Sequence, residues 1–369
     1  MKGIFINYGQ TCKKDKSGIG LKIRTQIKVF NEEGLNCHEL VLPVRRDKLS
    51  LTLYRLPFLN ISPVWKYYRE FGEADYIYMR RPYVMNYYMR KVLEKIRKVN
   101  PRVKIVIEIP TYPYDAEYQK SKFKQMLLWK DKHNRVRMKE FIDYYAILTE
   151  EQEVFGIPTV KIENGIDVAN IIPKKYIVST GSVIHMCAIA MFKEWHGYER
   201  LFYGLRSYYK NGGKRNIICH FVGKGSELPV YEKIVQEEHL EEHVKFYGFL
   251  SGEELENIYN KSSIALSTFG MYKIGLNLSC ALKTREAVAR GIPMITGCPT
   301  DIFTGQDYKY YLEFPNDDSE LDIQKIVDFY DKIYMEENGE DVVRNIRKYA
   351  FETIDMAKCM KNVIEFFKS

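Results

Sequence analysis

The chain has 369 residues and a formal net charge of +8, and its length leaves room for two domains. Hydrophobic residues make up 46% of it and aromatic residues 14%, which is the composition of a globular protein. It has no run of eighteen apolar residues, and Met1 to Asn7 becomes polar too early for a signal peptide, so we expect a cytoplasmic protein. Its seven cysteines include no CxxC pair, which argues against a disulfide framework and against a zinc site.

Positive charge is concentrated in the first half of the chain. Residues 1–171 contain 31 Lys and Arg against 20 Asp and Glu, a net charge of +11, whereas the remainder carries −3. The densest basic segment, residues 118–140, interleaves its lysines and arginines with Phe123, Leu127 and Trp129. This pattern fits a helix on an anionic membrane surface, a helix that grips nucleic acid, or a solvated helix whose apolar stripe packs on its own domain. Because no nucleic-acid motif occurs in the chain, we expect one of the other two arrangements.

Short apolar runs alternate with helical patterns through this first half. The predicted strands are residues 3–8, 37–42, 76–78, 103–109, 144–148 and 160–162. Helical patterns separate them, for example at residues 21–33 and 87–99. The alternation predicts a parallel β-sheet covered by helices.

A carboxylate interrupts one of these apolar runs. Glu108 lies within the predicted strand 103–109. A buried carboxylate is costly unless it is paired. We therefore expect Arg80 or Arg81 to be its partner.

The second half repeats the alternation. Its predicted strands are residues 186–190, 216–222, 244–247, 264–267 and 294–296, with helices near 197–210, 228–239, 252–259 and 283–290. Two such sheets predict two Rossmann-like α/β domains, residues 1–171 and 172–351, divided after the turn at Asn164-Gly165. The final amphipathic helix, residues 352–369, can belong to either domain and would complete the first.

Glycines and charges follow several of these strands. Gly18 and Gly20 lie between the first strand and the first helix, and Gly223-Lys224-Gly225 follows the strand 216–222. Such turns let backbone amides approach a phosphate or a sugar hydroxyl, although glycine-containing βα turns are common. Another helix begins with Lys283, Arg285 and Glu286. Since ligands gather at the carboxyl ends of parallel strands, a nucleotide would span these segments, although lone helix charges are often only solvated.

Stretches throughout the chain, most of them in the second half, resemble the retaining GT-B glycosyltransferases of family 4, known as group 1 glycosyltransferases. The matching stretches are residues 163–167 (ENGID), 195–201 (WHGYERL), 221–225 (FVGKG), 244–249 with 253–255, and 286–293 (EAVARGIP). Each is weak alone, but their order and spacing are specific together. Residues 108–115 (EIPTYPYD) resemble a stretch of capsule and exopolysaccharide assembly enzymes.

The resemblance implies a GT-B fold, with two Rossmann-like domains facing a cleft. It implies transfer of a hexose, with retention, from a nucleotide-sugar donor in the second domain to a saccharide or lipid-linked saccharide held by the basic first domain. No cofactor and no metal are expected, and the first domain would meet an anionic membrane at the inner face.

The resemblance and the residues together predict a site. We expect donor-binding roles for Gly18, Gly20, His196, Gly223, Lys224, Gly225, Leu250, Arg285 and Glu286. Catalytic roles are expected for Lys193, Lys283 and Glu286. Acceptor-binding roles are expected for Tyr112, Tyr114 and Asp115, unless the prolines beside them only shape a turn.

The chain also departs from the family pattern. Leu278 stands where the family has a second Glu, and Ala190 and His196 stand where it has an Arg and a Lys that flank the diphosphate. Lys193 or Lys283 would then supply the charge. These departures leave open a sugar-binding or scaffolding relative that has lost transfer. A nucleotide-dependent oxidoreductase is a weaker alternative, since neither half has GxGxxG followed by an acidic residue about twenty positions later.

Overall fold

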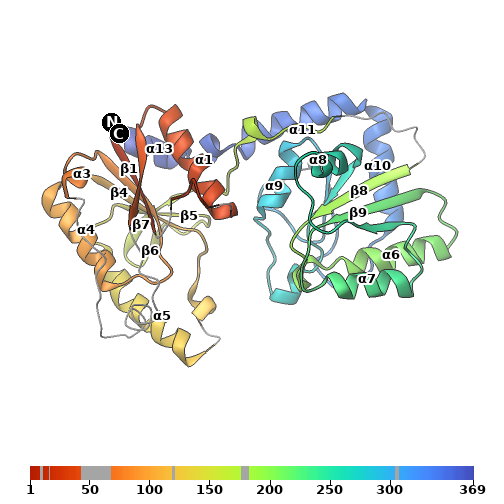
Figure 1. The fold of residues 1–369 in the computed structure, drawn as a ribbon, viewed down its shortest axis with the longest axis horizontal. Coiled ribbons are helices and arrows are strands. Elements are labelled where there is room, and N and C mark those ends of the chain that lie inside the picture. Colours follow the sequence, from red (N-terminus) through yellow and green to blue (C-terminus); the bar gives the residue numbers. More distant parts are fainter. Residues whose placement is uncertain (9–10, 16, 43–67, 119–120, 176–182, 304–306) are drawn as a thin grey trace. The chain divides into compact units, whose positions relative to one another are not determined.

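The computed structural model describes residues 1–8, 11–15, 17–42, 68–118, 121–175, 183–303 and 307–369 (Figure 1). The chain forms two compact units. Unit 1 comprises Met1–Gly165 and Met356–Ser369, and unit 2 comprises Ile166–Asp355. The division therefore lies at Gly165, six residues before the boundary expected from the sequence at residue 171. In the described part of the chain, no helix is both long enough and apolar enough to cross a membrane.

Unit 1 is built on a seven-stranded sheet. Its strands are β1 (Gly3–Tyr8), β2 (Cys37–Leu42), β3 (Tyr76–Arg80), β4 (Lys104–Ile109), β5 (Tyr144–Ile147), β6 (Glu153–Val154) and β7 (Ile157–Lys161). They lie in the order β2-β1-β3-β4-β5-β7-β6. All neighbours are parallel except β6, which pairs antiparallel to β7. The carboxyl ends of β1 to β5 therefore meet at one edge.

Two cores cover the faces of this sheet, because successive strand residues point to opposite sides. The helices of unit 1 are α1 (Gly18–Glu32), α3 (Tyr68–Gly72), α4 (Tyr87–Val99), α5 (Lys122–Arg135), α12 (Met356–Cys359) and α13 (Lys361–Lys368). Ile4 and Ile6 of β1 pack in the core that includes residues of α3, α4 and α5. Phe5 packs in the other core, with α1, α12 and α13. Unit 1 is thus a sheet between two helical layers.

The C-terminal segment differs from the single helix expected over residues 352–369. Helix α11 (Gly339–Thr353) ends in unit 2, and α12 and α13 follow as separate short helices. Ile166 donates its N–H to Ile354 O (3.0 Å) and forms a parallel bridge with Asp355, which interrupts the helix. The outgoing and returning connections between the units therefore run side by side, and the chain's end completes unit 1.

Unit 2 has a six-stranded parallel sheet. Its strands are β8 (Val183–Ile189), β9 (Asn216–Val222), β10 (Val244–Phe246), β11 (Ile264–Leu266), β12 (Met294–Thr296) and β13 (Tyr311–Glu313), in the order β10-β9-β8-β11-β12-β13. Its longer helices are α6 (Glu199–Lys210), α7 (Leu228–Glu237), α8 (Gly252–Lys261), α9 (Leu282–Ala289), α10 (Ile323–Glu336) and α11. Residues of the strands and of most of these helices form one core.

Candidate functional site

The sheet of unit 2 reverses its direction of growth at its centre. From β8 the chain adds β9 and β10 on one side, and it then adds β11, β12 and β13 on the other. Ligands of open parallel sheets bind outside the carboxyl ends of the strands at such a reversal. The loop after β8, the loop after β11 and the start of α9 border this point. Strand order is a tertiary property, so sequence reasoning missed the importance of residues 267–270 after β11.

The glycines after β9 allow two loops to touch. Gly223 has φ of 136°, and a Cβ built on it would lie 1.8 Å from the carbonyl oxygen of Ala190. A Cβ on Gly225 would lie 2.0 Å from the carbonyl oxygen of Phe192. The N–H of Phe192 donates to the carbonyl of Lys224 (2.8 Å). The predicted turn Gly223-Lys224-Gly225 therefore lies directly against the loop after β8.

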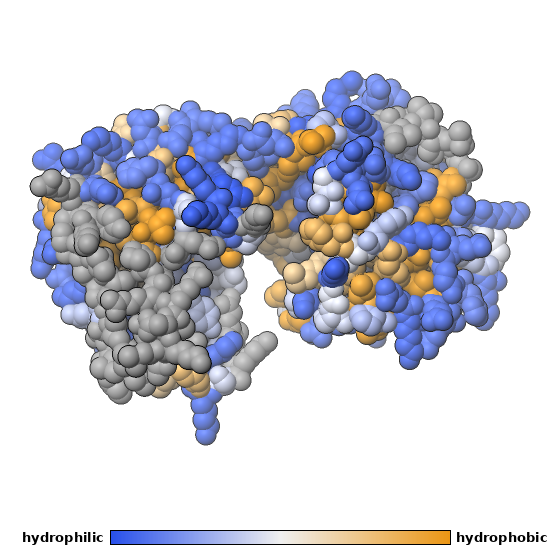
Figure 2. Space-filling view, viewed as in Figure 1, coloured by the Kyte–Doolittle hydropathy of each residue, from blue (hydrophilic) through white to orange (hydrophobic). Residues whose placement is uncertain are grey.

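The loop after β10 joins the same edge. Gly223 donates its N–H to Gly248 O (2.7 Å), and Leu250 packs, partly buried, against the core. Phe249 and Met191, each next to one of these contacts, are 73% and 71% exposed. Figure 2 shows hydrophobic residues gathered among hydrophilic ones on the visible face of unit 2. Met191 and Phe249 thus add exposed apolar surface beside the loops after β8 and β10.

His196, in the loop after β8, is held as a neutral imidazole. Its Nδ1 lies 2.9 Å from the backbone nitrogen and 3.1 Å from the carbonyl oxygen of Lys193, so Nδ1 finds a partner in either tautomer of the ring. Burial and the nearby charge of Lys283 lower the pKa of His196 to about 3. Phe269 donates its N–H to His196 O (2.7 Å), which ties this loop to the one after β11. The side chain of Lys193 is only partly buried.

The start of α9 gathers cationic N–H groups that lack acceptors. Lys283 Nζ is buried and has no hydrogen-bond partner in the described part of the chain, and burial lowers the pKa of Lys283 to about 7. Arg285 is 1% exposed, and its Nη2 pairs with Asp301. Its Nε and Nη1 are buried without a partner among the same residues. The helix N-cap, Ala281, supplies no side-chain cap, and the first turn holds no acidic residue. Such an arrangement fits a bound anion.

Glu286 follows on the same helix and keeps much of its carboxylate available. The carboxylate is 41% exposed and contacts Arg290 Nη2 at 3.4 Å. Arg290 is held mainly by Glu256, with two hydrogen bonds of 2.7 and 2.9 Å. A partly exposed carboxylate can accept hydrogen bonds from two adjacent hydroxyl groups.

Gly18 and Gly20 lie in unit 1, whereas the other donor-binding candidates lie in unit 2. Ser17 caps α1 by accepting the N–H of Gly20 at its Oγ (3.2 Å). A Cβ on Gly20 would lie 2.4 Å from the carbonyl of Asp15, so glycine is required for the close turn. Gly18 is exposed at the first position of α1.

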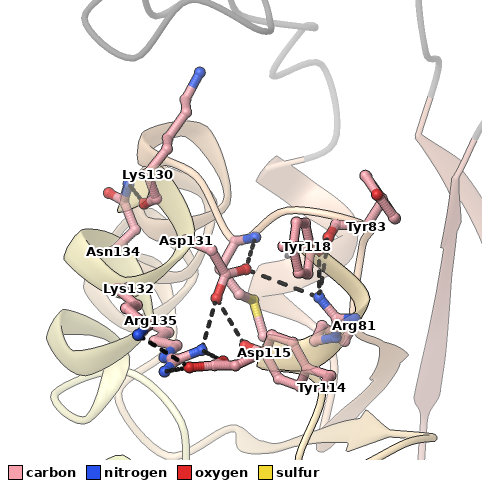
Figure 3. A network of polar contacts seen from close by, with 11 residues as sticks. Arg81, Tyr83, Tyr114, Asp115, Tyr118, Lys130, Asp131, Lys132, Asn134 and Arg135 are labelled. Atoms are coloured by element: carbon pink, nitrogen blue, oxygen red, sulfur yellow. Dashed lines mark hydrogen bonds and ion pairs between the residues drawn. The ribbon is translucent and has the colours of Figure 1, made fainter. Parts of the chain in front are cut away.

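Two of the acceptor-binding candidates of unit 1, Tyr114 and Asp115, belong to a polar network around Asp131 of α5 (Figure 3). Asp131 is fully buried and accepts hydrogen bonds from the Met85 N–H (2.7 Å), the Tyr114 hydroxyl (2.7 Å) and Arg135 Nη1 (3.3 Å). Arg81 Nη1 lies 3.8 Å from Oδ2, the oxygen that also accepts the Met85 N–H. The network holds the segment after β4 onto α5.

The three candidates are placed differently, because Tyr112 packs against the ring of Phe155 and not within this network. Tyr114 is 1% exposed, with Arg81 stacked 3.7 Å from its ring centroid. Asp115 is bound by Arg135 (2.7 and 3.3 Å) and by Lys132 (3.1 Å), and Tyr112 is only partly buried. Sequence reasoning missed Asp131 and Arg135 because they stand in a basic helix that looked solvated. A role in acceptor binding stays a prediction for all three.

The structure also places Leu278 and Ala190, two residues at which the sequence departs from the family pattern. Leu278 is 47% exposed in the segment before α9, and Ala190, the residue after β8, donates its N–H to Val222 O (3.0 Å). In the ranges that the structure describes, no group of three or more His, Cys, Asp or Glu side chains could hold a metal ion.

Part of unit 2 matches a protein-family model, and the whole chain matches solved structures in fold. Residues 184–317 match the family model of the group 1 glycosyl transferases. No curated protein matches the sequence. The matched segment contains the strand ends, the loops and α9 described above.

Solved structures match over the full chain at low identity. Anabaena HepE in complex with UDP superposes with a TM-score of 0.61 at 13% identity, covering 100% of both chains. Sucrose-phosphate synthase from Thermosynechococcus elongatus gives 0.61 at 16%, covering 100% of this chain and 99% of the other. WaaG, a glycosyltransferase involved in lipopolysaccharide biosynthesis, gives 0.61 at 12% over 100% of both. The predicted fold class, GT-B with two Rossmann-like domains, is confirmed. The family model and the shared fold together support a glycosyltransferase.

Proposed function

We propose that the chain transfers a hexose, with retention and without a metal ion, from a nucleotide sugar to a saccharide or lipid-linked saccharide during cell-surface polysaccharide synthesis. The observation that carries this proposal is the start of α9, where buried cationic N–H groups without acceptors stand at the reversal point of the sheet. HepE binds UDP in a related fold, which makes a uridine nucleotide the first donor to test.

The chemistry requires positive charge where the leaving group forms. When the bond between the sugar and the diphosphate breaks, its electron pair stays on the diphosphate and adds negative charge there. Lys283, Arg285 and the first amides of α9 would stabilise that charge, and His196 would add a neutral donor in the tautomer that carries its proton on Nε2. Lys193 is a further cation in the loop after β8.

The other residues that would contact the nucleotide sugar are assigned from their positions at the site. Glu286 would accept hydrogen bonds from two ribose hydroxyls, because its carboxylate is partly exposed beside the cationic groups. The close turn at Gly223, Lys224 and Gly225 would present backbone amides to the donor. Leu250 follows the loop that Gly223 contacts, and we assign it to the same donor site.

We also propose that unit 1 meets an anionic membrane at the inner face through α5. This helix buries charged and polar residues, including Lys130, Asp131 and Arg135, while Phe123 and Trp129 are 41% and 51% exposed. The exposed residues Lys122, Lys132, Arg137 and Lys139 accompany them, and Lys120 lies outside the described residues. An aromatic and basic outer face suits the boundary between headgroups and acyl chains.

The test is a thermal-shift and hydrolysis screen of the wild-type protein and Glu286→Ala against UDP-, GDP-, ADP- and TDP-linked sugars. A ligand that binds only the native state raises the melting temperature by mass action. We expect one nucleotide sugar to raise it by several degrees. Loss of the carboxylate should weaken binding by about tenfold or more. Slow release of the nucleotide would then identify an enzyme rather than a binding protein.

Glu232→Ala, at an exposed glutamate of α7, is the matched control and should respond like the wild type. Folding of Glu286→Ala should be preserved, because Arg290 keeps both hydrogen bonds to Glu256. If no nucleotide sugar shifts the melting temperature, the donor site is wrong. Binding without hydrolysis or transfer would instead favour the relative that has lost transfer.

A further inference from the structure

Lys283 differs from the other lysines and arginines around the site, because its ammonium is buried and no group in the described part of the chain compensates its charge, whereas Lys193 and Lys224 are partly or fully exposed to water. Its Nζ is buried without a hydrogen-bond partner. Lys273, by contrast, pairs with Glu199, and Arg285 pairs with Asp301. A buried ammonium without a counter-ion is unstable, so the amine loses its proton or gains an anion.

The groups packed around Lys283 do not supply that anion. From the loop after β8 comes neutral His196, and from the start of α6 comes the ring of Tyr198, whose centroid lies 5.9 Å from Nζ. A small cavity of about 10 Å³ beside Lys283 is lined by Cys187 of β8, Tyr259 of α8, Ser267 and Thr284, together with apolar residues. Burial raises the pKa of Cys187 and of Tyr259, so both stay uncharged near neutral pH.

The carboxylate nearest along α9 has another partner. Glu286, three residues after Lys283, contacts Arg290. The hydroxyls of Ser267 and Thr284 lie 3.0 Å apart and bond to each other. The environment of Nζ therefore contains uncharged groups and, within α9, the further positive charge of Arg285.

We propose that Lys283 takes up a proton when a diphosphate group binds at the start of α9, so that the empty site holds an amine and the occupied site an ammonium. This inference rests on the proposed donor site and adds a proton to its binding reaction. The proton comes from solvent and binds the Nζ lone pair, and it returns to solvent when the nucleotide leaves. Burial without compensation keeps the pKa of Lys283 at about 7 in the empty site, and a nearby diphosphate would raise it.

The direct test follows the Lys283 side chain by NMR in protein labelled with ¹³C at the lysine ε-carbon. Lys283→Arg identifies the signal by its absence. We expect the signal to titrate near pH 7 in the empty protein. Millimolar inorganic pyrophosphate or UDP-glucose should move the midpoint upward by at least one pH unit. A midpoint near that of free lysine in the empty protein, or a midpoint that neither anion moves, overturns the proposal.

Affinity for UDP-glucose gives the second readout. Wild-type affinity should fall by up to tenfold per pH unit between the Lys283 midpoint of the empty protein and that of the complex, because binding captures a proton only in this interval. The side chain stays charged in Lys283→Arg and uncharged in Lys283→Met. The affinity of both variants for UDP-glucose should therefore be independent of pH, with tight binding by Lys283→Arg and weak binding by Lys283→Met. His196 cannot produce the slope, since its Nδ1 is occupied and its pKa lies about 3.

The outcomes separate this inference from the proposed function. If a nucleotide sugar stabilises the protein but leaves the Lys283 signal unmoved, the donor site stands and proton uptake fails. If pyrophosphate moves the signal while no nucleotide sugar binds, the anion site stands and the glycosyltransferase proposal fails.

Discussion

Glu108 of β4 is a fully buried carboxylate whose charge is stabilised by groups from two other elements, α1 and β3. Lys22 Nζ of α1 lies 3.0 Å away, Arg80 Nε of β3 lies 3.9 Å away, and Gln26 and Tyr78 each donate a hydrogen bond of 2.7 Å. Burial would raise the pKa of Glu108, but Lys22 and Arg80 lower it to about 2. The expected partner Arg80 is confirmed, whereas Lys22 is closer and was not expected. Arg81 joins the Asp131 network instead.

The depressed pKa sets the direction of a pH effect on stability. A carboxylate whose pKa falls from about 4.5 to about 2 on folding stabilises the protein above pH 4.5, and this contribution disappears as the pH falls toward 2. Glu108→Gln should therefore lower the stability of unit 1 at pH 7 by about 3 kcal/mol or more, because Lys22 is left buried without its partner. Differential scanning calorimetry measures this loss.

The control is Glu73→Gln, which removes an ion pair with Lys2 whose side chains are 69% and 68% exposed. Its effect should stay within about 1 kcal/mol. If Glu108→Gln is as stable as the wild type, the ionised Glu108 does not stabilise unit 1. The same holds if the two proteins differ in free energy of unfolding by the same amount at pH 7 and at acid pH.

At the scale of elements, α5 reverses the arrangement expected for a helix that packs on its own domain. Leu127 is buried, but Trp129, expected on the same apolar stripe, is exposed, and the inner face carries Asp131, Asn134 and Arg135 instead. The inner face is polar because its side chains form hydrogen bonds and ion pairs with Tyr114 and Asp115 in the segment after β4. The helix therefore leaves its largest apolar side chain outside.

This reversal predicts membrane binding that depends on Trp129. Full-length Trp129→Ala should bind phosphatidylglycerol-containing vesicles more weakly, by several-fold, in a flotation assay, because burial of an indole contributes free energy at the interface. High salt should weaken both proteins. Met335→Ala, at an 85% exposed apolar residue of α10 in unit 2, should leave binding unchanged. Equal binding by all three proteins would exclude α5 as the contact.

For the molecule as a whole, the last fourteen residues return to unit 1 and close one of its cores. Phe367 is fully buried, stacks on Tyr76 with centroids 4.1 Å apart, and meets Phe30 and Tyr78 edge-on. Lys104 of β4 donates to the carbonyl of Phe366 (2.8 Å). Unit 1 therefore depends on residues that the chain reaches only after completing unit 2.

Phe367→Ala should destabilise unit 1 by about 3–5 kcal/mol, as expected for a large cavity in a packed core, and leave unit 2 folded. Calorimetry should show one transition shifted downward and the other unchanged. Phe351→Ala in α11 is the control, since Phe351 is 42% exposed. A common downward shift of both transitions would mean that the units unfold together.

The sequence by itself determined the alternation of strands and helices, the presence of two α/β domains and the glycines of the βα turns. These features depend on local periodicity and on backbone geometry, which each segment carries within itself. Gly223 illustrates this, because its turn needs a positive φ, which glycine adopts at low cost. The resemblance in residues 163–167 and 195–293 added the fold and a class of reaction.

Only the tertiary structure decided which side chains lost water and which partners they met. Lys283 and Arg285 looked like ordinary charges at a helix start, and the structure buries them at a reversal of strand order that no local pattern encodes. Asp131 meets Met85 and Tyr114 from distant segments, and Phe367 packs on strands placed hundreds of residues earlier. Burial and pairing depend on contacts between remote parts of the chain, and those contacts set the charge state on which the proposed site depends.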